Sequence, residues 1–216
     1  MTRLLTLFVF FSSLVTIASA QIEKRMILIG GQIFYYNSDI DFSTNQPNQK
    51  NRSATFNISV GKALKTNDVY GVNLSYSPVS NKNIYDGGMF VNTEVHFYSP
   101  GLFYRHYKTL GKDFYFFLEA GISYLHWKQV STDTPGTNVL TATQSGGQFT
   151  VTPGIFYRLY KRLHLELIVP NLVTLQYAAT TEVMPAETIK QKQFLANTSL
   201  NANSTIFLGV GFHFIL

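Results

Sequence analysis

After residue 20, apolar residues alternate with small or polar residues over most of the chain. The clearest stretch runs from Phe114 to Leu125. Its even positions hold Phe, Leu, Ala, Ile and Tyr, and its odd positions hold Tyr, Phe, Glu, Gly, Ser and Leu. Successive side chains of a strand point to opposite faces, so a period of two predicts β-strands with two unlike faces. Eight such segments lie at about 27–37, 54–63, 69–77, 101–109, 114–125, 148–159, 163–175 and 205–216.

A soluble β-sandwich and a membrane β-barrel would both show this alternation. The two architectures differ in the residues on the less apolar face of each strand and in the lengths of the connections. The second face carries mainly Gly, Ser, Asn, Thr and single charges, which suits a narrow polar interior. Short turns at 64–68, 110–113 and 160–162 alternate with long polar connections at 38–52, 78–92, 127–146 and 178–203. This layout is typical of a bacterial barrel with both termini in the periplasm. We therefore predict an all-β fold, an eight-stranded antiparallel up-and-down transmembrane β-barrel.

The first twenty residues predict a cleavable secretory signal peptide. A short basic start at Arg3 precedes an apolar run, and Ala18-Ser19-Ala20 forms a small-x-small cleavage site before Gln21. The alternative, a helical anchor, needs a longer apolar run than this one to cross about 30 Å of hydrocarbon. We expect residues 1–20 to be removed and residues 21–216 to form one outer-membrane domain.

Composition narrows the possible functions. The chain has no cysteine, which excludes a disulfide framework, a lipid anchor on cysteine and thiolate chemistry. Charged residues make up 13% and aromatic residues 15% of the chain, as expected when one surface faces lipid. The net charge of +5 comes from dispersed basic residues rather than a cluster, so nucleic-acid binding is not expected. We expect no cofactor.

The C-terminal segment carries a resemblance to a known group. Apolar residues stand at alternate positions up to the chain end: Leu208, Val210, Phe212, Phe214 and Leu216. In this respect the chain resembles the small outer-membrane β-barrel proteins of the OmpX-like and OmpW-like group. Their last strand usually ends in an aromatic residue, where this chain has Leu216. The resemblance implies residence in the outer membrane, contact with lipid and lipopolysaccharide, and recognition by the barrel insertion machinery.

Aromatic residues are expected to gather at the two edges of the lipid-facing band. The expected members are Tyr70, Tyr104, Tyr157 and Tyr160 near the short turns, and Tyr76, Tyr124, Trp127 and Tyr177 near the long connections.

Four charges are predicted to face the interior: Arg105, Glu119, Arg158 and Glu166. Arg105 and Glu119 lie symmetrically about Lys112, and Arg158 and Glu166 about Arg162, so each pair should meet across a hairpin. Buried charges must be paired. We interpret the set as a structural salt-bridge network that fills the interior, with a gated pore or a catalytic set as alternatives.

The five histidines lack the spacing of a metal site, so no metal is expected. We predict no catalytic and no cofactor-binding residues. Three functions remain open. The first is a non-enzymatic barrel that contributes to envelope structure or binds a surface ligand or receptor through four extracellular loops. The second is a narrow channel or carrier for small hydrophobic molecules. The third is a lipid A-modifying enzyme, for which His126 and Ser131 near the rim are the candidates.

Overall fold

The computed structural model describes residues 22–40, 48–85, 90–133, 138–169, 172–184, 187–198 and 209–216. The predicted cleavage site at Ala18, Ala20 and Gln21 lies outside these residues. The described strands are β1 (Ile27–Ile40), β2 (Asn48–Lys65), β3 (Asp68–Ile84), β4 (Phe90–Thr109), β5 (Phe114–Asp133), β6 (Asn138–Arg158), β7 (Leu163–Ile168), β8 (Val173–Val183), β9 (Thr188–Thr198) and β10 (Gly209–Ile215). No helix in the described part of the chain is long and apolar enough to cross a membrane.

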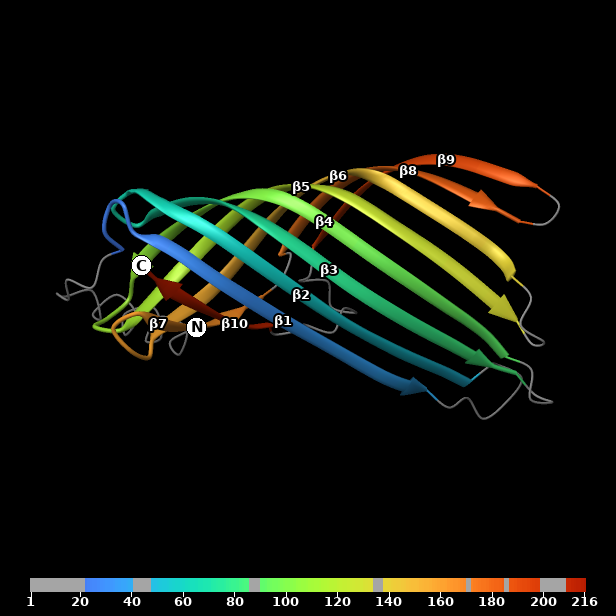
Figure 1. Cartoon of the computed structure of the whole chain (residues 1–216), viewed down its shortest axis with the longest axis horizontal. Helices are drawn as coiled ribbons and strands as arrows, with labels where there is room; N and C mark the ends of the chain where they lie inside the picture. The colour runs from blue at the N-terminus through green and yellow to red at the C-terminus, as the bar shows by residue number, and fades with distance from the viewer. Residues whose placement is uncertain are drawn as a thin grey trace, which may run out of the picture.

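Eight of these strands form a closed antiparallel ring in the order β1-β2-β3-β4-β5-β6-β7-β10, with β10 paired back onto β1 (Figure 1). The ring confirms the expected all-β up-and-down order. The strands β8 and β9 form a further hairpin, which pairs through β8 with the far half of β6. Ile27 and Leu216 exchange backbone hydrogen bonds, so the end of the chain closes onto the start of β1.

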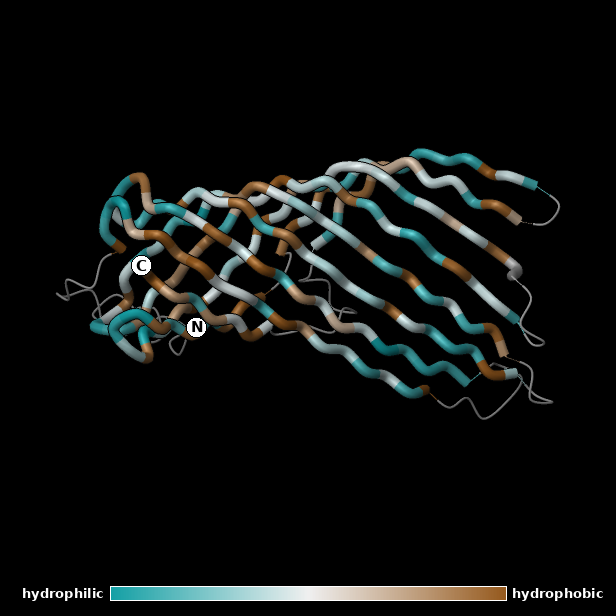
Figure 2. The backbone as a smooth tube through the Cα atoms, in the orientation of Figure 1, coloured by the Kyte–Doolittle hydropathy of each residue, from teal (hydrophilic) through white to brown (hydrophobic). Residues whose placement is uncertain are grey.

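The alternation predicted from sequence is confirmed by the burial of the strands. Along β5, Phe114, Leu118 and Ile122 are exposed on the outer face, whereas Tyr115 and Phe117 are buried inside the ring. The four residues of the predicted insertion signal are all exposed: Val210, Phe212 and Phe214 on β10, and Leu216 directly after it. Figure 2 shows hydrophobic residues recurring along the strands and hydrophilic residues prevailing at the far ends of β1, β2 and β3.

Most strands are longer than the sequence predicted, and the predicted long connections are largely wrong. Much of 78–92 and 127–146 belongs to the paired strands β3 to β6, and the connection 178–203 contains the unpredicted strand β9. Backbone hydrogen bonds hold a ladder whatever the side chains are. Strands of Thr, Ser, Asn and Gln on both faces therefore continue without the apolar alternation on which the prediction depended.

The predicted seventh strand, 163–175, is interrupted. Gly154 pairs with Ile168 on β7, but Val151 pairs with Val173 on β8, so two extra residues lie on the β7–β8 side. Pro153 stands between these pairs on β6, and its carbonyl accepts the N–H of Val169 at 3.0 Å. A proline has no N–H to continue the ladder, which accounts for the irregularity at this position.

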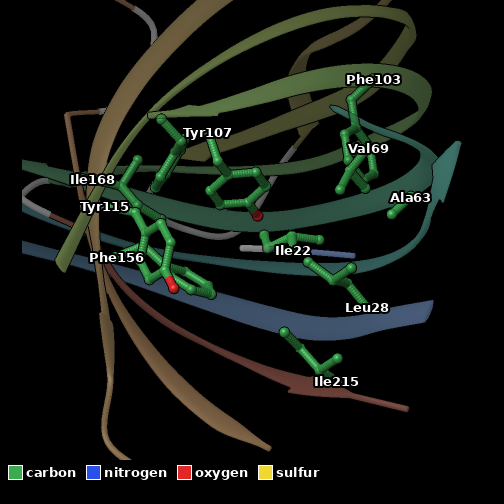
Figure 3. Close-up of a cluster of buried hydrophobic side chains, with 11 residues drawn as sticks. Ile22, Leu28, Ala63, Val69, Phe103, Tyr107, Tyr115, Phe156, Ile168 and Ile215 are labelled. Atoms are coloured by element: carbon green, nitrogen blue, oxygen red, sulfur yellow. The ribbon is translucent and has the colours of Figure 1, made fainter. Parts of the chain in front are cut away.

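The interior at the turn end of the ring is filled by apolar and aromatic side chains (Figure 3). Tyr107, Tyr115 and Phe117 pack around Phe156, whose ring centroid lies 5.2 Å from that of Tyr107. The segment before β1 covers this end, because Ile22 is buried in the cluster and exchanges hydrogen bonds with Asn67. The described residues therefore close the ring at its turn end.

The expected aromatic residues occupy the outer face at both edges of the apolar band, with one exception. Tyr70 contacts Tyr104 near the short turns, and Tyr76 contacts Tyr98 at the far edge. The prediction for Trp127 is wrong. It follows the inward Leu125 by two residues, and its indole N–H donates to Gln144 Oε1 at 2.7 Å, inside the ring.

Candidate functional site

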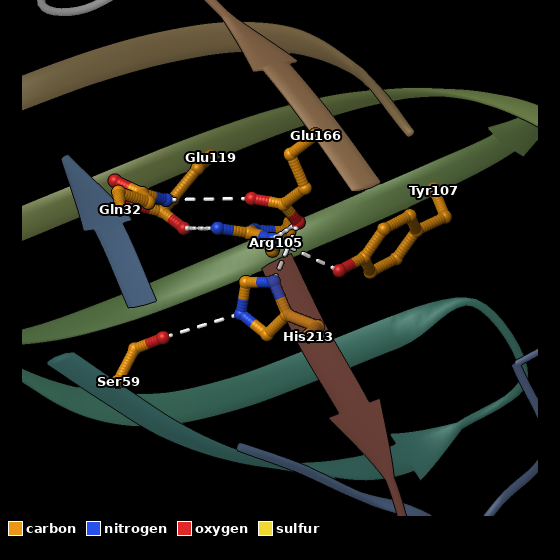
Figure 4. A network of polar contacts seen from close by, with 7 residues as sticks. All are labelled: Gln32, Ser59, Arg105, Tyr107, Glu119, Glu166 and His213. Atoms are coloured by element: carbon orange, nitrogen blue, oxygen red, sulfur yellow. Dashed lines mark hydrogen bonds and ion pairs between the residues drawn. The ribbon is translucent and has the colours of Figure 1, made fainter. Parts of the chain in front are cut away.

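A buried network of polar side chains lies directly above the aromatic cluster, and Arg105 on β4 is its centre. The ladder pairs Arg105 with Glu119 on β5. The third member, Glu166, comes from β7, on the other side of β6. Inward alternation on three strands thus brings one guanidinium and two carboxylates together (Figure 4).

The distances show that both carboxylates are bound by the same arginine. Arg105 donates to Glu119 Oε2 from Nη2 at 2.7 Å and from Nε at 2.8 Å. Its Nη1 donates to Glu166 Oε1 at 2.5 Å and to Tyr107 Oη at 3.0 Å. The guanidinium also stacks over the ring of Phe117, 4.3 Å from its centroid. The side chain of Glu166 is 0% exposed and that of Arg105 is 2% exposed, whereas Glu119 keeps 14%.

Four members of the network were not predicted from the sequence, namely Tyr107, His213, Ser59 and Gln32. His213 Nδ1 lies 2.9 Å from Glu166 Oε1, and its Nε2 is hydrogen-bonded to Ser59 Oγ at 3.2 Å. Gln32 Nε2 donates to Glu166 Oε2 at 3.4 Å. The alternation in the first and last predicted segments, 27–37 and 205–216, places Gln32 and His213 on the inner face. A polar side chain on the inner face of β1 or β10, the two strands that close the ring, therefore indicates a member of the network.

The expected pairing of Arg158 with Glu166 is wrong. The β6–β7 turn centres one residue earlier than predicted, so Phe156 stands opposite Glu166 and Arg158 opposite His164. Arg158 instead donates from Nη2 to Asp113 Oδ1 at 2.8 Å, in a half-exposed ion pair at the turn end. The structure thus brings together three of the four predicted charges and leaves the fourth outside the network.

The other histidines do not form a second site. His96 is bonded to Tyr76 and His106 to Asp68 on the outer face. His164 is buried against Phe156, and neither of its ring nitrogens has a hydrogen-bond partner among the described residues. In that same part of the chain, no group of three or more His, Asp or Glu side chains could hold a metal ion.

The predicted enzymatic pair is not assembled. Ser131 is buried on the inner face, where its hydroxyl is bonded to that of Thr93 at 2.9 Å. His126 lies on the outer face, and its Nδ1 is bonded to Ser145 Oγ at 3.0 Å. The side chains of His126 and Ser131 therefore point to opposite faces of the same strand.

A cavity of about 680 Å³ opens above the network on the inner face. Gln32 and Glu119 form its floor, so the charge network separates this cavity from the aromatic cluster. The walls combine hydroxyl and amide side chains with a few apolar ones: Ser53, Thr55, Asn57, Asn73, Ser75, Gln148, Thr150, Phe34, Tyr36 and Phe97. The interior is filled at one end and hollow toward the other.

No family model and no curated protein matches this chain. Among solved structures it is similar to Neisserial surface protein A, with a TM-score of 0.44 and 13% sequence identity. The matched region covers 88% of this chain and 96% of that protein.

Proposed function

We propose that the chain is an integral β-barrel of a bacterial outer membrane, closed to ions, that contributes to envelope structure or binds a surface ligand. Its expected partners are outer-membrane lipid and lipopolysaccharide, the barrel insertion machinery, and an extracellular ligand or receptor. The role is not enzymatic in this proposal, because the predicted His126 and Ser131 point to opposite faces of β5.

One observation carries the proposal, namely the exposed apolar band between two aromatic edges. On β5 the outward residues from Phe114 to Tyr124 are apolar or aromatic, and His126 and Lys128 follow. About ten steps of about 3.3 Å, tilted by about 40°, span about 25 Å, which is the height of an outer-membrane barrel's apolar band. In water such a surface would be a large aggregation liability, whereas lipid would cover it.

We predict that the purified protein, inserted in planar bilayers, shows no steady ion conductance. The physical reason is that Phe117, Phe156 and Tyr107 fill the turn end and Arg105 closes the space above them. The measurement is single-channel recording, with a known porin as the positive control. Regular conductance steps that disappear when the protein is omitted would contradict the closed interior.

We also predict the orientation of the strands. The chain has no cysteine, so single introduced cysteines can be labelled without background. A membrane-impermeant maleimide should label Glu187→Cys, in the β8–β9 connection, on intact cells. Lys112→Cys, in the β4–β5 turn, should react only after permeabilisation, because short turns face the periplasm. Labelling of Lys112→Cys on intact cells would reverse the proposed orientation.

A carrier for small hydrophobic molecules is the second candidate, and an observation on strand pairing favours it. Among the described residues, β1 pairs only with β2 beyond Ile33, and β9 pairs only with β8. The inward Phe34 and Tyr36 of that part of β1 line the cavity. Filling the cavity by Ser75→Trp, at a residue that lines it, would test this role. Unchanged uptake of a hydrophobic tracer by cells that make the Ser75→Trp variant would argue against it.

A further inference from the structure

We propose that the outer face of β5, β6, β8 and β9 binds a phosphorylated glycolipid of the outer leaflet, of the lipid A type. The acyl chains would lie in a groove and the phosphates would contact a lysine patch above it. This inference rests on the proposed outer-membrane location and assigns to it a particular ligand site.

The groove lies on the outer face of the ring and has a volume of about 840 Å³. Its walls are mainly apolar: Leu102, Tyr124, Leu175, Tyr177 and Phe194, with Gly147 at the centre. Gly147 lies directly opposite both Tyr124 and Tyr177 in the ladder, so its missing side chain creates the hollow between the two rings. An ideal Cβ at Gly147 would meet only the carbonyl of Ser123 at 3.9 Å, which shows that space is open there.

The lysine patch adjoins the groove on the side away from the short turns. Side chains two residues apart along a strand share a face, so the outward residues form successive rows across the four strands. Tyr124, Gly147, Tyr177 and Phe194 form one row across four strands. The next row is His126, Ser145, Ala179 and Lys192, and the one above it is Lys128, Thr143, Thr181 and Lys190. These last two rows hold three lysines, a histidine, three hydroxyl side chains and no carboxylate.

The chemistry of the two parts identifies the ligand class. Lysine ammonium groups and hydroxyls bind phosphate, and an adjoining apolar groove of this size accepts acyl chains. Lys128 and Lys190 stand three strand spacings apart, about 14 Å, which is wider than one phosphate group needs. A headgroup with two phosphates on a sugar backbone matches that width and the hydroxyls between the lysines. The position of the patch also matches the proposed orientation, in which the short turns face the periplasm and the opposite end of the ring faces the outer leaflet.

The test uses the full chain purified in detergent and measures retained lipid by native mass spectrometry. Bisphosphorylated lipid A, its dephosphorylated form and phosphatidylglycerol compete at equal concentration. Wild-type protein should retain bisphosphorylated lipid A most strongly. The triple variant Lys128→Gln, Lys190→Gln and Lys192→Gln should lose that retention by on the order of tenfold or more. A matched triple, Lys62→Gln, Lys65→Gln and Lys108→Gln, removes three exposed lysines at the turn end and should bind as the wild type does.

A second pair of variants tests the groove. Gly147→Leu should fill it and reduce retention of bisphosphorylated lipid A, whereas Gly31→Leu, on the outer face of β1, should not. Equal retention of the dephosphorylated form, or equal loss in both lysine triples, would overturn the site. Retention of phosphatidylglycerol as strong as that of lipid A would overturn the assignment to a glycolipid. Recovery of the protein in a soluble fraction would instead overturn the proposed location. The lipid competition does not measure location, so the two failures can be told apart.

Discussion

Replacing Glu166 by Gln is expected to lower the free energy of unfolding by about 3–5 kcal/mol, the usual effect of breaking one side of a buried ion pair. The side chain of Glu166 is fully buried and receives contacts from Arg105, His213 and Gln32. Glutamine keeps the shape of the side chain but leaves the buried guanidinium with one carboxylate instead of two. The measurement is the midpoint of urea unfolding in vesicles, followed by tryptophan fluorescence.

Glu119→Gln is the matched control, because it removes the same charge from the same arginine. Its effect should be smaller, since Glu119 is 14% exposed and borders the cavity, where water can compensate. The double change Arg105→Leu with Glu166→Leu should recover part of the stability, because it removes both fully buried charges and leaves only the cavity-lining Glu119 without its cation. Equal midpoints for wild type and Glu166→Gln would show that the network does not hold the ring together.

The second large effect is expected at the outer face. Leu118→Arg, at a position 43% exposed near the middle of the apolar band, should destabilise the protein by about 2–4 kcal/mol in vesicles. The cause is the cost of placing a guanidinium at the midplane of a bilayer. If the same surface faced water, a substitution at so exposed a site would change stability by less than about 0.5 kcal/mol. Unfolding by urea in vesicles measures the difference.

Ser80→Arg provides the comparison for this experiment. Ser80 is exposed on the outer face of β3, beyond the aromatic edge at Tyr76, and stands between Arg52 and Glu94 in the ladder. Arginine there should be tolerated, because one neighbour repels it and the other attracts it. A similar loss of stability for Ser80→Arg and Leu118→Arg would indicate a general intolerance to arginine and would remove this support for a membrane location.

The sequence alone was sufficient where a local rule decides the outcome. A period of two assigns each side chain to one face, so Phe114, Ile122 and Phe214 were correctly placed outside and Tyr115 and Phe117 inside. A short hairpin fixes its own register. For that reason the pairing of Arg105 with Glu119 followed from their symmetry about Lys112.

Only the tertiary structure decided which groups meet across the ring. Glu166 and His213 lie far from Arg105 in sequence, and the curvature of eight paired strands brings their inward side chains to one point. The turn at 159–163 also shifted by one residue, which moved Arg158 from Glu166 to Asp113. Alternation fixes the face of each residue, but closure of the sheet and the geometry of each turn fix its neighbours, and these depend on contacts that no local pattern contains.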